Sequence, residues 1–178
     1  MIYTFLAQGF EECEALAPVD ILRRAGLEVY TVGVGSKFIK GSHDITVECD
    51  ITTDEVSLEK LEAVILPGGM PGTLNLENSN TVQEFIDFAA NNNLVIGAIC
   101  AAPSILGHKG LLNGKKATCF TGFEKDLIGA EVVTDRAVKD GNIVTAYGAG
   151  AAFDFGFLLL EALKGKTAAE DMKKQMRY

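Results

Sequence analysis

The sequence predicts an α/β fold built on a mostly parallel β-sheet. Short apolar runs rich in Val, Ile and Leu alternate with amphipathic stretches of helical length, and this alternation is typical of successive βαβ units. The chain has 178 residues, of which 48% are apolar, so it can bury a sheet that helices cover on both faces. Because no repeat or Pro/Gly/Ser-rich linker interrupts the pattern, we expect residues 1–178 to form one domain.

The first part of the chain predicts a strand, a helix and a second strand. The apolar residues 2–7 predict the first strand, and residues 11–24 predict a helix in which Pro18 should cause a kink or a restart. Gly26 is placed to end that helix. Residues 27–34 then predict the second strand.

A small antiparallel β-hairpin is expected next. Residues 36–51 contain the turn-like sequence GSHD followed by alternation in ITVEC, which indicates a hairpin. Residues 61–66 predict a buried strand that runs into the loop sequence PGG. Residues 81–90 are expected to form a helix behind that strand.

The strand predicted at residues 94–99 should be the most central, because its composition is the most apolar. It is followed by Cys100 and by a short helix that begins at Pro103 and ends near Leu106. The remaining elements are strands near residues 116–120, 131–133 and 142–146, a helix at 153–163, and a last helix at 167–176 with Ala168, Met172 and Met176 on one face.

The charge balance and the cysteines limit what the chain can bind. With 24 acidic and 16 basic residues the formal charge is −8, so neither a nucleic acid nor an anionic membrane is an expected partner. The four cysteines lack CxxC spacing, which argues against a zinc site and a disulfide framework. The sequence shows no secretory signal and no stretch long enough to span a bilayer. We therefore expect a reduced, cytoplasmic protein whose partners are small molecules or other proteins.

The strongest chemical signal is LVIGAICAAPSIL at residues 94–106, where a buried strand passes into a helix with a cysteine at the turn. This arrangement has the form of a nucleophile elbow. Ligands gather at the carboxyl ends of parallel strands, and a thiol near a helix N-terminus is expected to have a lowered pKa. Cys100 is therefore the candidate nucleophile, and the alternative is a small cysteine that only fills the core.

A nucleophilic cysteine needs a group that exchanges protons with it. His108 is expected to be a solvated residue at a helix end and His43 lies in the hairpin, so a Cys–His dyad would need His43 or a partner subunit. Among the carboxylates of QGFEECEA we select Glu14, and we attribute Glu11 and Glu12 to the preference of acidic residues for helix N-termini. A Glu14 carboxyl close to the thiolate would hold one proton shared by the pair.

Two glycine-containing sequences remain. The loop LPGGMPG, residues 66–72, and the turn after the elbow cysteine offer backbone N–H groups to an oxyanion, with Gly68, Gly69 and Ala101 as the candidate donors. The sequence GAGAAF, residues 148–153, lacks the third glycine of a dinucleotide loop. Neither a cofactor nor a metal is therefore expected.

Several motifs together resemble one known family. LAQGFEECEALAPVDILRRAG, VILPGG, AICAAPSIL and GAGAAFDFGFLLLEALKGK occur in the order and spacing of the ThiJ/PfpI superfamily, and within it of the parkinsonism-associated (DJ-one) protein deglycase branch. The resemblance covers almost the whole chain. It implies a flavodoxin-like three-layer α/β/α sandwich and a homodimer, with Cys100 as the reactive cysteine, Glu14 as its protonated partner, and Gly69 and Ala101 as oxyanion donors.

The chain departs from the family pattern around the expected site. Ala101 follows the cysteine where peptidase-like members carry histidine, so peptidase activity is not expected. Phe120 stands where many deglycase-branch members carry an active-site histidine, and the family's GPG turn reads GAG at residues 148–150. A family arginine in the hairpin appears as His43. The candidate substrate-pocket residues are therefore His43, Phe120, Gly148 and Ala149.

Three functions follow as hypotheses. The first is an enzyme in which the Cys100 thiolate attacks a small 2-oxoaldehyde, such as methylglyoxal, and Glu14 moves protons during conversion to a 2-hydroxy acid; the resemblance adds deglycation of proteins and nucleotides. The second is an oxidative-stress sensor whose Cys100 oxidises to sulfinate. The third is a chaperone or partner-binding module that uses a surface of the dimer.

Overall fold

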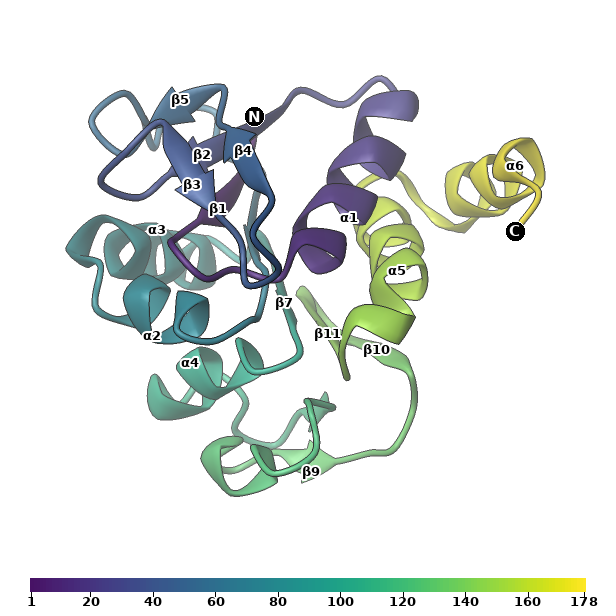
Figure 1. Ribbon diagram of the computed structural model, residues 1–178. Helices are drawn as coiled ribbons and strands as arrows, with labels where there is room; N and C mark the ends of the chain where they lie inside the picture. The colour runs from purple at the N-terminus through teal and green to yellow at the C-terminus, as the bar shows by residue number, and fades with distance from the viewer.

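The computed structural model describes all residues from Met1 to Tyr178 and has a seven-stranded sheet at its centre (Figure 1). The strand order is β10-β11-β7-β6-β1-β2-β5, and every neighbouring pair is parallel except β10 and β11. The strands are β1 (Ile2–Leu6), β2 (Val29–Gly33), β5 (Ile51–Thr52), β6 (Ala63–Leu66), β7 (Val95–Ile99), β10 (Ala137–Asp140) and β11 (Ile143–Ala146). The mostly parallel α/β sheet predicted from the sequence is confirmed.

Helices cover both faces of this sheet and give three layers (Figure 1). On one face lie α2 (Gly72–Glu77), α3 (Asn80–Asn91) and α4 (Pro103–His108), and on the other lie α1 (Glu12–Arg24) and α5 (Ala152–Lys164), while α6 (Lys166–Met176) packs against α5. Successive residues of a strand point to opposite faces, so Tyr3 and Phe5 pack toward α3 while Ile2 packs toward α1 and α5. No helix combines the length and the apolar character needed to cross a lipid bilayer.

Two small sheets stand apart from the main one. The predicted hairpin is confirmed as the antiparallel pair β3 (Phe38–Lys40) and β4 (Thr46–Glu48). The short strands β8 (Lys116–Ala117) and β9 (Glu131–Val132) pair in parallel. Two 3₁₀ turns complete the fold, η1 (Glu124–Asp126) and η2 (Ala149–Ala151). The segment between β8 and β9 lies below the carboxyl ends of the central strands in Figure 1.

Several expectations need correction. Helix α1 continues through Pro18 instead of restarting there. The strand before Cys100, β7, is third in the sheet, and the central place belongs to β6. Helix α2 and the strands β5 and β10 were not predicted. In α6 the buried residues are Ala169 and Met172.

Candidate active site

Cys100 follows directly after β7, at the carboxyl edge of the sheet. Its φ is 65°, a left-handed conformation that is costly for a residue with a side chain. Two backbone hydrogen bonds hold it there: its N–H donates to Ala146 O at 2.9 Å, and its carbonyl oxygen accepts from the N–H of Phe120 at 2.8 Å. A strained, half-buried residue at a strand end is the geometry of a nucleophile elbow.

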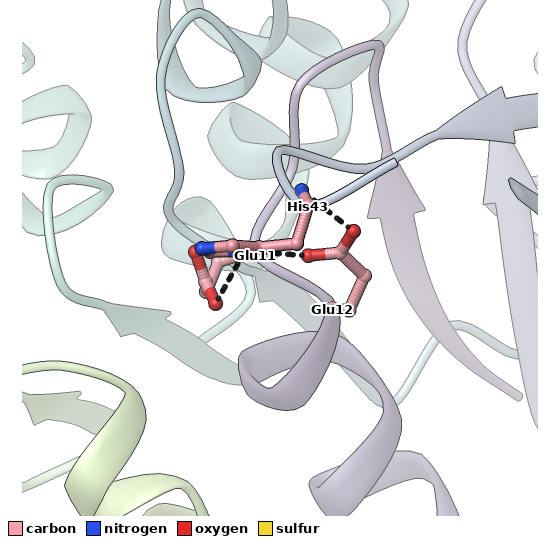
Figure 2. A group of neighbouring side chains, drawn as sticks. All are labelled: Glu11, Glu12 and His43. Carbon is pink, nitrogen blue, oxygen red and sulfur yellow. Dashed lines mark hydrogen bonds and ion pairs between the residues drawn. The ribbon is translucent and has the colours of Figure 1, made fainter. Parts of the chain in front are cut away.

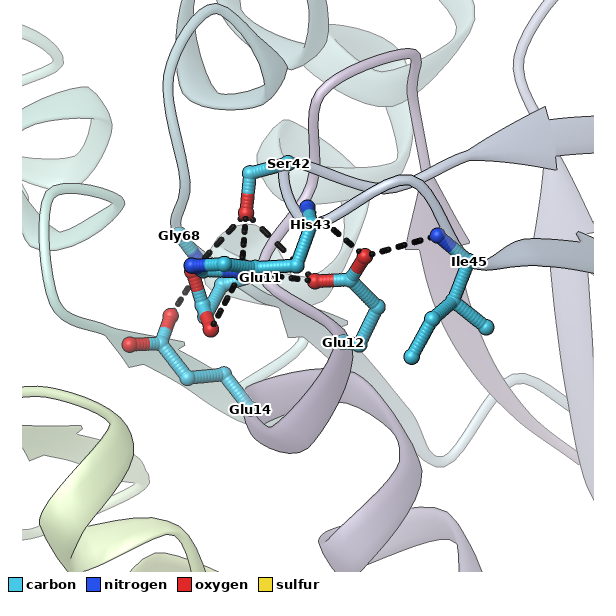
Figure 3. A network of polar contacts seen from close by, with 7 residues as sticks. All are labelled: Glu11, Glu12, Glu14, Ser42, His43, Ile45 and Gly68. Carbon is cyan, nitrogen blue, oxygen red and sulfur yellow. Dashed lines mark hydrogen bonds and ion pairs between the residues drawn. The ribbon is translucent and has the colours of Figure 1, made fainter.

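Glu14 lies beside this cysteine. It belongs to the first turn of α1 and is only 1% exposed. Its carboxyl adjoins the Cys100 side chain, and its Oε2 accepts from the N–H of Gly68 at 2.9 Å (Figure 3). A methyl group added at Gly68 would lie 2.6 Å from Cys100 Cβ and 2.7 Å from Glu14 Oε2, so only glycine fits between the two side chains.

Burial and mutual repulsion determine how this pair ionises. Burial raises the pKa of Glu14 from 4.5 to about 7. Burial, together with the negative charge of Glu14, raises the pKa of the Cys100 thiol to about 12. Two negative charges in contact are unfavourable, so the pair loses its first proton near neutral pH and keeps the second. The expected lowering of the cysteine pKa by a helix dipole is therefore wrong, and α4 begins only at Pro103.

The candidate oxyanion donors divide into two groups. The N–H groups of Gly69 and Ala101 both lie close enough to the Cys100 sulfur to favour its thiolate and so lower the pKa of the thiol, which places them beside the position where a reacting atom would bind. The N–H of Gly68 donates instead to Glu14. Gly68 is therefore not a free oxyanion donor, and its role is to hold the carboxyl.

His43 lies in a polar network between the hairpin and the start of α1 (Figure 2). Its Nδ1 is 3.2 Å from Glu12 Oε2 and 3.4 Å from Glu11 Oε1. The Ser42 hydroxyl donates to Glu11 Oε2 at 2.9 Å. These contacts direct the His43 ring toward Glu11 and Glu12 (Figure 3), whereas the carboxyl that adjoins Cys100 is that of Glu14.

Glu12 has a structural role that the sequence did not indicate. It is 4% exposed, and its Oε1 accepts from the backbone N–H groups of His43 at 2.9 Å and Ile45 at 3.3 Å. Glu11, Glu12 and His43 each have one side-chain atom that could ligate a metal ion, and these three atoms lie within 4.8 Å of one another. The Glu12 and His43 side chains already make the contacts that join the hairpin to α1.

The three other residues predicted to line the substrate pocket are Phe120, Gly148 and Ala149. Phe120 is 51% exposed, and a methyl group added at Gly148 would lie 3.3 Å from its ring and 4.0 Å from Glu14 Oε1. Phe120 and Gly148 therefore border the pair, and Ala149 follows in the exposed turn η2. A cavity of about 410 Å³ begins at Phe120 and extends between the segments 118–121 and 132–134.

His108, Cys13 and Cys49 lie outside the site, and Cys119 lines the cavity that begins at Phe120. His108 is not simply solvated: its Nδ1 is 2.5 Å from Glu77 Oε1 and its Nε2 is 3.7 Å from Asp126 Oδ1. All four cysteines are free; Cys13 is exposed, and Cys49 and Cys119 are buried. Burial raises the pKa of both buried thiols to about 11. Neither thiol is hydrogen-bonded to a carboxyl that could accept its proton, whereas Glu14 adjoins the Cys100 sulfur.

Comparisons with known proteins agree on one family. The model of the DJ-1/PfpI family matches residues 1–162. The protein dj-1beta of Drosophila melanogaster is 34% identical over 172 residues, which are 95% of this chain and 92% of that protein. A Caenorhabditis elegans protein named glutathione-independent glyoxalase DJR-1.2 is 27% identical over 168 residues, which are 93% of this chain and 89% of the relative.

Solved structures show the same fold. Oxidized DJ-1 of Toxoplasma gondii superposes with a TM-score of 0.94 at 30% identity, over 99% of this chain and 97% of that one. Drosophila melanogaster DJ-1beta superposes with a TM-score of 0.92 at 32% identity, over 99% of this chain and 96% of that one. The predicted three-layer fold and the resemblance noted in the sequence are thus both confirmed.

Proposed function

This chain belongs to the DJ-1/PfpI family, and we propose that it is a cysteine-dependent glyoxalase that needs no cofactor and converts small 2-oxoaldehydes to 2-hydroxy acids. One observation carries the proposal: a buried carboxyl with a pKa of about 7 contacts the sulfur of a strained elbow cysteine. The name of the C. elegans relative, a glutathione-independent glyoxalase, supports this reaction class.

The proposed reaction begins with the pair carrying one proton. The pKa values of about 7 for Glu14 and about 12 for Cys100 place this proton on the sulfur at rest, so it passes to the Glu14 carboxylate as the sulfur becomes the attacking thiolate. The sulfur attacks the aldehyde carbon of methylglyoxal, and the carbonyl π electrons move to oxygen to give a hemithioacetal oxyanion. The N–H groups of Gly69 and Ala101, which already point at the sulfur, are placed to stabilise that oxyanion. The Glu14 proton then neutralises it.

The second half of the reaction moves hydrogen from one carbon to the next. Glu14, now a carboxylate, removes the proton from the former aldehyde carbon, and the ketone carbon receives a proton through the resulting enediol. This leaves a thioester between Cys100 and the 2-hydroxy acyl group. Water hydrolyses the thioester, releasing lactate and restoring the pair with its single proton. No oxidant enters, because one carbon is oxidised while its neighbour is reduced.

The test is lactate formation from methylglyoxal by the wild type, Cys100→Ser and Glu14→Gln, without added glutathione or metal. We expect turnover by the wild type and its loss in both variants. Cys13→Ser is the matched control, because it removes an exposed thiol outside the site and should keep full activity. Lactate formation that survives Cys100→Ser would contradict the proposal.

A second candidate function is redox sensing, and the surroundings of the sulfur favour it. Two backbone N–H groups and the Glu14 carboxyl converge on Cys100, so they can hydrogen-bond to a sulfinate formed there. In a Cys13→Ser background, mild peroxide should add two oxygen atoms to Cys100 and leave Cys49 and Cys119 unchanged. Intact-mass and peptide analysis would test this, and equal oxidation of all three thiols would contradict it.

We also propose that the chain forms a homodimer through α1 and the β3–β4 hairpin. Large apolar side chains are exposed on both elements, with Leu16 at 38%, Phe38 at 57% and Ile45 at 56%. Both elements adjoin the network around Glu12. Sedimentation equilibrium of the wild type and of Leu16→Asp tests the dimer, which the variant should weaken.

A further inference from the structure

The cavity beside Phe120 is not used by the reaction described above. Its volume is about 410 Å³, far more than the methyl group of methylglyoxal would fill. Its walls come from residues that follow β8, from the last residue of β9 and the two residues after it, and from Tyr147. The fold therefore maintains an open space at the carboxyl edge of the sheet, beside the elbow.

Phe120 connects this space to the reacting pair. Its side chain lines the cavity, its N–H donates to the carbonyl oxygen of Cys100 at 2.8 Å, and its ring faces Gly148. A methyl group placed on Gly148 would be 3.3 Å from that ring and 4.0 Å from Glu14 Oε1. The ring and the carboxyl thus border the same small gap, and a molecule bound to Cys100 has Phe120 as its next neighbour.

The lining chemistry indicates which group fits. Five of the nine lining residues are hydrophobic, among them Phe120, Val132, Val133 and Tyr147. The only charged lining residue is Glu124, whose Oε2 accepts from the N–H of Gly122 at 2.7 Å. An apolar wall with a single carboxylate favours an uncharged substituent and disfavours an anionic one.

We propose that this cavity is the subsite for the substituent R of a substrate R–CO–CHO, and that it selects bulky, uncharged apolar groups over methyl. The inference rests on the glyoxalase function proposed above. The reaction is unchanged: the aldehyde carbon bonds to Cys100 while R lies over Phe120 and enters the cavity. An additional apolar group that a hydrophobic pocket encloses raises kcat/KM by about tenfold or more.

The test compares methylglyoxal with phenylglyoxal, which would give mandelate. We expect the wild type to show a kcat/KM for phenylglyoxal at least about tenfold higher than that for methylglyoxal. Val133→Phe, which fills the cavity, should lower kcat/KM for phenylglyoxal by about tenfold or more and more strongly than kcat/KM for methylglyoxal, so that the preference is reversed. Should Val133→Phe not fold, Val132→Trp serves the same purpose. Ile128→Trp is the control, because Ile128 is 56% exposed in the same segment and does not line the cavity.

Two outcomes would overturn the subsite: equal loss of both activities in the cavity variants, or no preference in the wild type. A binding measurement separates this inference from the function on which it rests. Acetophenone has the phenyl ketone but no aldehyde, and it should shift the methyl NMR signals of Val132 and Val133. Such shifts in a protein that turns over neither aldehyde would refute the glyoxalase function and leave the cavity as an apolar binding site. Absent shifts would refute the site itself.

Discussion

The backbone N–H of Phe120 donates a 2.8 Å hydrogen bond to the carbonyl oxygen of Cys100. The N–H of the same cysteine donates to Ala146 at 2.9 Å, so the elbow is fixed from two sides by segments far away in sequence. A left-handed residue persists when its surroundings fix its backbone in this way. The strain at Cys100 is therefore part of the native structure and can be measured.

The first prediction concerns that strain. Cys100→Ala and Cys100→Gly both remove the thiol, but only alanine keeps a Cβ at a φ of 65°. We expect the glycine variant to be more stable by about 0.5–1 kcal/mol, because relief of the left-handed strain exceeds the added entropy of an unfolded glycine. Urea unfolding of the two variants measures the difference, and a less stable glycine variant would show that the turn carries no strain.

The second prediction concerns pH. Glu14 has a pKa of about 7 in the folded protein against an ordinary 4.5, so between these values the folded state keeps a proton that the unfolded state has lost. Stability should therefore fall as pH rises from 4.5 to 7, by up to about 3 kcal/mol. Glu14→Gln removes this pH-dependent loss. The free energy of unfolding of the variant, relative to that of the wild type, should therefore be larger at pH 8 than at pH 5. Chemical unfolding at both pH values tests it, with the exposed Glu59→Gln as control.

The third prediction concerns Gly68. A methyl group there would meet both Cys100 Cβ and Glu14 Oε2 at less than van der Waals distance, so Gly68→Ala should separate the pair. We expect a loss of about 1–3 kcal/mol in unfolding free energy and a fall of about 100-fold in methylglyoxal turnover. Gly150→Ala is the control, because its nearest neighbour would be Tyr147 OH at 3.7 Å. Comparable losses in the control would mean that crowding at Gly68 is not the cause.

The fourth prediction concerns His108, which bridges Glu77 and Asp126. The hydrogen bond to Glu77 is the main cause that raises the pKa of His108. A raised histidine pKa contributes stability that is fully present below the unfolded value, about 6.5, and is lost as pH rises through the folded value. Because the ring is partly exposed, the contribution should be about 0.2–1 kcal/mol. In thermal unfolding, the wild type should have a higher Tm than His108→Gln at pH 5.5, and the two Tm values should converge at pH 9.

The periodicity of the sequence was sufficient to predict the long elements, because each buries a continuous apolar face. It failed where an element is short or lacks such a face. Strand β5 has only two residues, and β10 alternates weakly because its residues are half-buried or exposed. The central position of β6 was also not predicted. The order of strands depends on how the chain crosses between them, and the amino-acid composition of a strand does not show this.

The candidate site was partly predictable for the same reason. Cys100 and Glu14 both follow strand ends, and parallel strands bring their carboxyl ends to one edge, so their proximity could be expected. The role of Glu12 could not, because its partners His43 and Ile45 lie about thirty residues away, in a hairpin whose position the sequence does not determine. Gly68 was wrongly predicted to be a free oxyanion donor, because the sequence does not show that its N–H donates to Glu14.

Helix α1, which carries Glu14, is held against α5 by an unusually close contact. A methyl group at Gly156 would lie 2.5 Å from Ile21 Cδ1 and 3.1 Å from Pro18 Cα, so α1 can occupy its position only while residue 156 has no side chain. A random-mutagenesis screen for lost activity should therefore recover Gly156 variants, although this glycine touches no substrate. A protein engineer who inspected only the residues around the cysteine would classify such a change as harmless.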